Sequence, residues 1–100
     1  MRFKNYLNDS YIGIVEGNPK TEIKDKKVLG LLKDLNRILQ DKYKKKDLRF
    51  DVVEDYQSPT EVLADELDET RLERITRKWM RISEEFEDIK EEHLKTLQEE

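Results

Sequence analysis

The chain has 100 residues, of which 44% are charged and 35% hydrophobic, so it forms one small domain at most. Lys and Arg number 20 against 24 Asp and Glu, a formal net charge of -4, and there is no cysteine for disulfides or zinc-thiolate sites. No apolar run approaches the roughly 20 residues that span a bilayer, and the N-terminus lacks the apolar core of a secretion signal. We therefore expect a soluble, cytoplasmic protein.

The charges are nearly balanced in number, and the apolar residues follow clear patterns. Both features favour a thin fold with a large solvated surface over disorder, and such a fold often relies on oligomerisation or a partner. Residues 1–60 carry 13 basic and 10 acidic residues, whereas residues 61–100 carry 7 and 14. This asymmetry predicts attraction between the basic and acidic halves, either within one chain or head to tail between copies. The alternative is that the charges are unevenly distributed over a polar surface and have no such role.

The first ten residues, MRFKNYLNDS, place Phe3, Tyr6 and Leu7 at helical spacing and end in turn residues. They predict an amphipathic helix of two turns, which needs docking because isolated helices of this length are marginal. Residues 11–15, YIGIV, predict a strand that ends at a Gly-Asn-Pro turn. Gly13 within this strand indicates a bulge or a close backbone approach.

The segment at about 25–45 has the periodicity of an amphipathic helix. Its apolar face comprises Val28, Leu31, Leu32, Leu35, Ile38, Leu39 and Tyr43. Asp25 suits the N-cap, and the lysine run at the end suits the negative pole of the helix dipole. Gly30 costs this helix about 1 kcal/mol relative to Ala, and would let a neighbouring element approach closely.

The next segment, residues 48–52, alternates between apolar and polar side chains and predicts a half-buried strand. The sequence SPTE then predicts the start of a helix. Ser58 serves as the cap, Pro59 fits the first helical position, and Glu61 completes a capping box.

A second capping box, TRLE, begins at Thr70. The C-terminal region is therefore one helix of about 38 residues or two shorter ones. An unbroken helix would be about 57 Å long, nearly twice the diameter of a small domain. We expect a break near 68–70 and a main helix over 70–97.

The predicted order is helix, strand, helix, strand and long helix, which defines a small, helix-dominated α+β fold with a minimal two-stranded sheet. We expect one domain, with a helix and strand region at 1–57 and a charged helical region at 58–100. Two strands alone are not stable in water. Either the last helix covers one face of the pair, or a second chain extends the sheet.

The main helix carries a heptad-spaced stripe of apolar residues. It comprises Leu72, Ile75, Trp79, Ile82, Phe86 and Ile89. The same heptad positions, which we call the seam, continue to His93 and Thr96. Two and a half regular heptads are short for a dedicated coiled coil, and Trp79 and Phe86 are bulky for a parallel two-stranded seam. The stripe therefore belongs either to the core of this chain or to an interface with a second copy or another protein.

Two basic groups are candidates for binding phosphate. One is the run of Lys42, Lys44, Lys45, Lys46 and Arg49, and the other is a row of Arg71, Arg74, Lys78 and Arg81 on the main helix. Such residues bind nucleic-acid phosphates. A solvated, ion-paired face also explains the row, because the same helix carries many carboxylates. Stabilisation of a helix C-terminus explains the lysine run without a ligand.

Carboxylates cluster at 51–55 and at 65–69, but no phosphate-binding loop, calcium loop or catalytic lysine accompanies them. His93 is the single histidine, and without cysteine a transition-metal site would have only carboxylates to complete it. No serine has the partners of a catalytic triad. We expect a protein that is not an enzyme and has no cofactor and no metal site.

The opening MRFKNYLND resembles the start of many small structural and assembly proteins of tailed bacteriophages. The match rests on Met1, Phe3, Lys4, Tyr6 and Leu7. The small size, the absence of cysteine and the charge-rich helices are similar in character to phage scaffolding, adaptor and assembly-chaperone proteins. The resemblance implies a viral protein of the host cytoplasm or the virion, and assigns no role to any residue.

The leading hypothesis is a non-enzymatic protein–protein interaction or assembly module. It would bind itself or another protein through the amphipathic C-terminal helix, with the flanking charges setting the register. The alternative is a nucleic-acid-binding or regulatory protein that uses the basic patch at 42–49 and the row at 71–81. A membrane partner is not expected.

Overall fold

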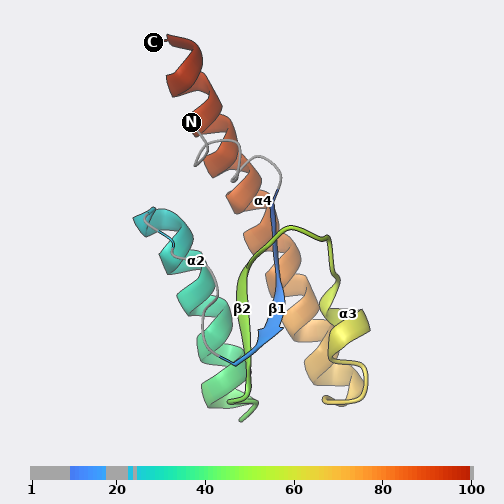
Figure 1. Ribbon diagram of the computed structural model, residues 1–100. Coiled ribbons are helices and arrows are strands. Elements are labelled where there is room, and N and C mark those ends of the chain that lie inside the picture. The colour runs from blue at the N-terminus through green and yellow to red at the C-terminus, as the bar shows by residue number, and fades with distance from the viewer. Residues whose placement is uncertain (1–9, 18–22, 24, 100) are drawn as a thin grey trace.

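The computed structural model describes residues 10–17, 23 and 25–99, with side chains up to residue 92. Its elements are β1 (Tyr11–Glu16), α2 (Lys26–Asn36), the wider π-helical turn η1 (Arg37–Lys42), β2 (Leu48–Val53), α3 (Pro59–Val62) and α4 (Glu69–Glu99). The predicted α+β fold, with its two-stranded sheet and long last helix, is confirmed, and the two strands are antiparallel (Figure 1). The helix expected near the N-terminus falls in residues 1–9, outside the described residues. Among the described helices, none combines the length and apolar composition needed to cross a membrane.

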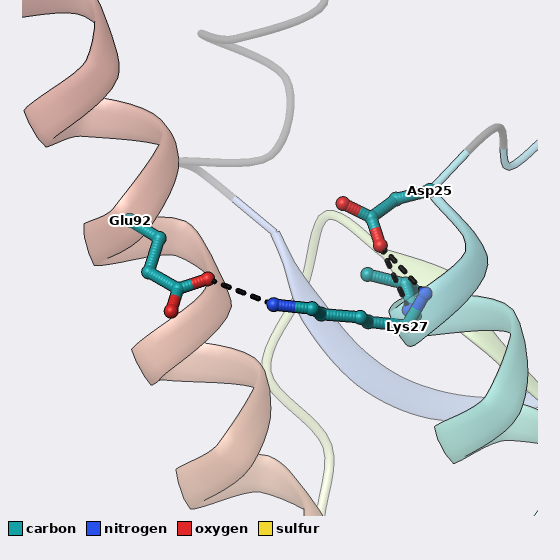
Figure 2. A network of polar contacts seen from close by, with 4 residues as sticks. Asp25, Lys27 and Glu92 are labelled. Carbon is teal, nitrogen blue, oxygen red and sulfur yellow. Dashed lines mark hydrogen bonds and ion pairs between the residues drawn. The ribbon is translucent and has the colours of Figure 1, made fainter.

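The start of α2 is fixed by Asp25, as its sequence position predicts. One oxygen of its carboxylate accepts hydrogen bonds from the backbone N–H groups of Lys27 (2.8 Å) and Val28 (3.2 Å), which otherwise have no partner in the first turn. The Lys27 ammonium also reaches across to α4, 3.2 Å from the Glu92 carboxylate (Figure 2). Both side chains of this ion pair are about two-thirds exposed, so it contributes little to stability.

The end of this helical segment differs from the predicted range of about 25–45. The backbone widens after Asn36, and the N–H of Tyr43 binds the carbonyl of Ile38, five residues back, at 2.8 Å. The N–H of Lys45 then binds the carbonyl of Leu39 at 3.0 Å, while Lys44 takes the left-handed conformation with φ of 64°. These bonds close the last turn, so the helix ends at residue 42.

The strands pair one to one, with Ile12 opposite Val52 and Gly13 opposite Asp51. The register contains no bulge at Gly13. A Cβ at that position would lie 2.7 Å from a methyl carbon of Val53 and 3.1 Å from the side-chain oxygen of Gln57. The atoms that approach this glycine belong to side chains and not to a neighbouring backbone, so neither predicted reason, a bulge or a close backbone approach, is correct.

The outer edge of β2 is occupied by side chains from the preceding helix. The Asn36 side chain accepts a hydrogen bond from the backbone N–H of Phe50 and donates one to its carbonyl at 3.1 Å. Gln40 donates to the carbonyl of Leu48 at 2.8 Å. Free strand edges invite pairing with another chain, and these contacts block that route on β2.

The outer edge of β1 is bound in the same way. Gln57 accepts a hydrogen bond from the N–H of Ile14 at 3.3 Å, and the indole N–H of Trp79 donates to the carbonyl of Ile12 at 2.7 Å. Figure 1 shows α2 and α4 flanking the two strands. The structure therefore favours the alternative in which the last helix covers the sheet over the one in which a second chain extends it.

One short helix, α3, lies between the sheet and the long helix. Ser58 caps α3, as predicted, but its hydroxyl accepts from the N–H of Thr60 at 3.3 Å, and no described hydrogen bond joins it to the Glu61 side chain. The chain leaves helical structure after Val62, and α4 begins at Glu69. Asp68 is the cap, because its carboxylate accepts from the N–H of Arg71 at 2.9 Å. The predicted capping box at Thr70 is wrong, since that residue lies inside the first turn.

Replacing Asn36 with Ala is expected to lower the free energy of unfolding by about 2 kcal/mol. The substitution leaves the N–H and carbonyl of Phe50 without their partner, and an unsatisfied buried polar group costs about 1–3 kcal/mol. Urea unfolding followed by circular dichroism measures the loss. Lys33→Ala, an exposed change on the same helix, should stay within about 0.5 kcal/mol of the wild type. Equal losses in the two variants would contradict this role of Asn36.

Candidate interaction surfaces

The apolar stripe of α4 lies in the core of the chain itself. The exposed fraction is 0% for Ile75, 5% for Trp79, 2% for Ile82, 1% for Phe86 and 8% for Ile89, and Leu72 is partly buried against the same core. The structure thus favours the intramolecular alternative, and of the buried stripe only Ile89 also borders a groove in the described surface. The predicted continuation of the seam, at His93 and Thr96, lies beyond the described side chains.

Trp79 links the core to a small aromatic surface. Its ring lies 5.9 Å from that of Tyr56, which in turn meets Tyr11 edge to face at 5.6 Å. Tyr56 is 64% exposed and Tyr11 is 38% exposed. Only the two tyrosines of this group are accessible to a partner, because Trp79 is covered.

Lys90 is a buried residue with several polar contacts, which were not predicted from the sequence. Its ammonium donates to the carbonyl of Ser10 at 3.0 Å, lies 2.8 Å from the Glu87 carboxylate and sits 5.0 Å from the centre of the Phe86 ring. The side chain therefore ties the start of β1 to α4. The sequence did contain a signal for this contact, because a lysine four residues after Phe86 lies next to it on the helix surface and therefore beside the stripe.

The structure brings part of the lysine run to the first turns of α4. The guanidinium of Arg71 lies 5.7 Å from the centre of the Tyr43 ring, and Lys42 and Lys44 flank that tyrosine in the sequence. The other members of the predicted row, Arg74, Lys78 and Arg81, follow Arg71 at helical steps of three and four. Segments that are far apart in the sequence thus bring basic side chains together where α4 begins, a group that we call the basic end. Carboxylates lie there too, since Asp68 is 4.0 Å from Arg71.

Two of the predicted phosphate-binding residues are used differently. Lys45 lies 3.1 Å from the carboxylate of Glu66. Arg49 lies on β2 and lines a cavity of about 760 Å³ beside α2, and the described lining of this cavity includes no residue of α4. The basic end therefore consists of Lys42, Lys44, Lys46, Arg71, Arg74, Lys78 and Arg81.

Charge is segregated along α4. From residue 69 to 82 the helix carries five basic and two acidic residues, whereas from 83 to 99 it carries seven acidic and two basic ones. Helix α2 runs antiparallel to α4, with Lys27 beside Glu92 and Tyr43 beside Arg71 (Figure 1). The segregation belongs to α4 itself, because the acidic cluster at 65–69 comes directly before its basic half, and Asp68 lies 4.0 Å from Arg71.

The outer surface between α2 and α4 forms a groove of about 520 Å³. We call it the α2–α4 groove, and it is lined by Lys27, Gly30, Leu31, Lys33, Asp34, Glu85, Asp88 and Ile89. A Cβ added at Gly30 would meet nothing within 4 Å, so the neighbouring element expected to approach this glycine closely is absent from the described fold. The groove therefore offers apolar and charged groups together on an open surface.

The carboxylate clusters do not form a recognisable metal centre. Within the described part of the chain, no group of three or more His, Asp or Glu side chains is placed to hold a metal ion. Asp51 is 3% exposed, and its carboxylate accepts from the N–H of Val52 at 2.8 Å. This carboxylate therefore binds a backbone N–H group of β2.

Trp79→Ala is expected to lower the free energy of unfolding by about 3–5 kcal/mol, the usual cost of removing a buried large aromatic side chain. It also removes the donor to the Ile12 carbonyl. The loss should be the same at low and high protein concentration, since the side chain serves the core of a single chain. Met80→Ala, a 55% exposed site one residue on, is the control and should change stability by less than about 0.5 kcal/mol. A loss that appears only at concentrations where copies associate would assign the stripe to an interface instead.

No family model, curated protein or solved structure matches this chain. The resemblance of the N-terminus to phage structural proteins stays a prediction, and any functional conclusion rests on the geometry above.

Proposed function

We propose that the protein is a non-enzymatic interaction module that assembles with copies of itself or with another protein through the outer, charged surface of its helices. The segregation of charge along α4 carries this proposal. Complementary charged surfaces steer two molecules together and select the partner and its orientation. A basic half and an acidic half on one helix are complementary to those of a second copy.

The roles of the two faces of α4 are separate in this proposal. The inner face holds the helix on the sheet, and the outer face displays charges. The ion pairs on the outer surface, such as Arg77 with Glu73 at 3.2 Å and Arg37 with Asp34 at 3.6 Å, are exposed. Exposed pairs contribute only about 0–1 kcal/mol, so exchanging them for contacts with a partner costs little.

Sedimentation equilibrium over a range of protein concentrations tests self-assembly. Association should be strongest near 0.01 M salt, where charges interact over about 30 Å, and should weaken at 0.15 M, where the screening length falls to about 8 Å. The observed mass should exceed 12.1 kDa as concentration rises at low salt. A 12.1 kDa species at every concentration and both salt levels would contradict self-assembly.

A second candidate function is binding to a nucleic acid or another polyanion at the basic end. The placement of Arg71 over Tyr43 supports it, because this contact joins the lysine run to the arginine row. Phosphate contacts depend strongly on salt and tolerate many sequences.

The test is titration of labelled single-stranded RNA and duplex DNA at low salt. If the basic end binds phosphate, the double substitution Lys42→Glu, Arg71→Glu should weaken binding to all sequences. The slope of the logarithm of the binding constant against the logarithm of the salt concentration should become less steep by about one per lost contact. Lys26→Glu, exposed at the other end of α2, is the control with little effect. No binding by the wild-type protein at low salt would rule this function out.

A further inference from the structure

The α2–α4 groove has two rims of opposite charge. On the α2 rim the side chains of Lys27 and Lys33 are exposed, and on the α4 rim those of Glu85 and Asp88 are exposed. Asp34, also on the α2 rim, lies 3.6 Å from Arg37 and is partly neutralised by it. The floor between the rims includes the apolar side chains of Leu31 and Ile89 and the bare backbone of Gly30.

We infer that this groove is the contact surface for a second copy of the same chain, related by a two-fold axis that runs along the groove. The inference rests on the proposed function, and it names the partner and the surface. Such an axis lays α2 of each copy over α4 of the other, because a closed two-fold contact uses the same patch on both molecules. The basic rim of one copy then faces the acidic rim of its partner.

The charges of the groove support this arrangement over others. Lys33, Glu85 and Asp88 take part in no ion pair within the described part of the chain. In the two-fold contact each copy's Lys33 meets the acidic rim of the other, and this happens twice in the dimer. Laying α2 on α2 instead would oppose lysines with lysines, which is unfavourable.

Gly30 fits the same contact. A glycine inside a helix costs about 1 kcal/mol relative to Ala. At this exposed position no atom of the described residues lies within 4 Å of where a Cβ would be, so none of them requires the residue to be a glycine. A glycine does permit close approach of another backbone. The second copy supplies that backbone, and Leu31 and Ile89 supply the apolar floor beside it.

The experiment exchanges the charges of the two rims and measures association by sedimentation equilibrium at low salt. Lys33→Glu alone and Glu85→Lys alone should each weaken self-association at least tenfold, because each opposes like charges at both contacts. An equimolar mixture of these two variants should associate again, since both contacts between unlike copies then join opposite charges. The matched control is Glu84→Lys, which makes the same charge change at an exposed position one residue outside the groove lining, and it should associate like the wild type.

Gly30 provides a second, independent arm. Gly30→Gln should abolish association. At a concentration where the wild type is monomeric, its thermal midpoint should equal that of the wild type or exceed it, because no described atom lies within 4 Å of a Cβ at this site and Gln is the better helix former. If the wild type associates but the rim variants associate equally well, or the mixture does not recover, the groove is not the interface, although self-assembly stands. If the wild type stays monomeric throughout, both the groove contact and self-assembly are overturned.

Discussion

The burial of the α4 stripe against the two strands and α2 is the interaction on which the rest of the structure depends. A sheet of two strands is at best marginally stable in water, and here its apolar side chains join those of Ile75, Ile82 and Phe86 in one core. Trp79 fills part of that core and binds the Ile12 carbonyl with its indole N–H. The same helix therefore buries the face of the sheet and provides a hydrogen-bond partner for a backbone carbonyl on its edge.

Burial of the stripe decides where a partner can bind. Apart from Ile89, which borders the α2–α4 groove, the stripe is not available for recognition, and both strand edges already have side-chain partners. What remains accessible is the outer surface of α2 and α4, the basic end and the two exposed tyrosines. Recognition at such a surface depends on charge and shape more than on apolar area, so it responds to salt.

Periodicity predicted most of the fold, because helical and strand patterns are local properties of the sequence. The strands, the helix capped by Asp25 and the long C-terminal helix all follow from them. Local patterns could not decide whether the α4 stripe packs on its own sheet or on another chain, since the same spacing serves both. The Gln57 contact to Ile14 joins residues 43 positions apart, and local sequence carries no signal for it. Asp68 and Thr70 are both good caps, so composition alone did not select between them.

The surface of the monomer contains unfavourable features that a second copy would relieve. Seven acidic residues crowd the second half of α4, where carboxylates three and four positions apart repel one another and also oppose the negative pole of the helix dipole. Gly30 adds the cost of a glycine in a helix, and no described residue packs closely enough against it to require one. Cations from the α2 rim of a partner would offset the first cost, and close packing over Gly30 would offset the second. Both costs lie at the α2–α4 groove or beside it, so a single contact between copies accounts for the two together.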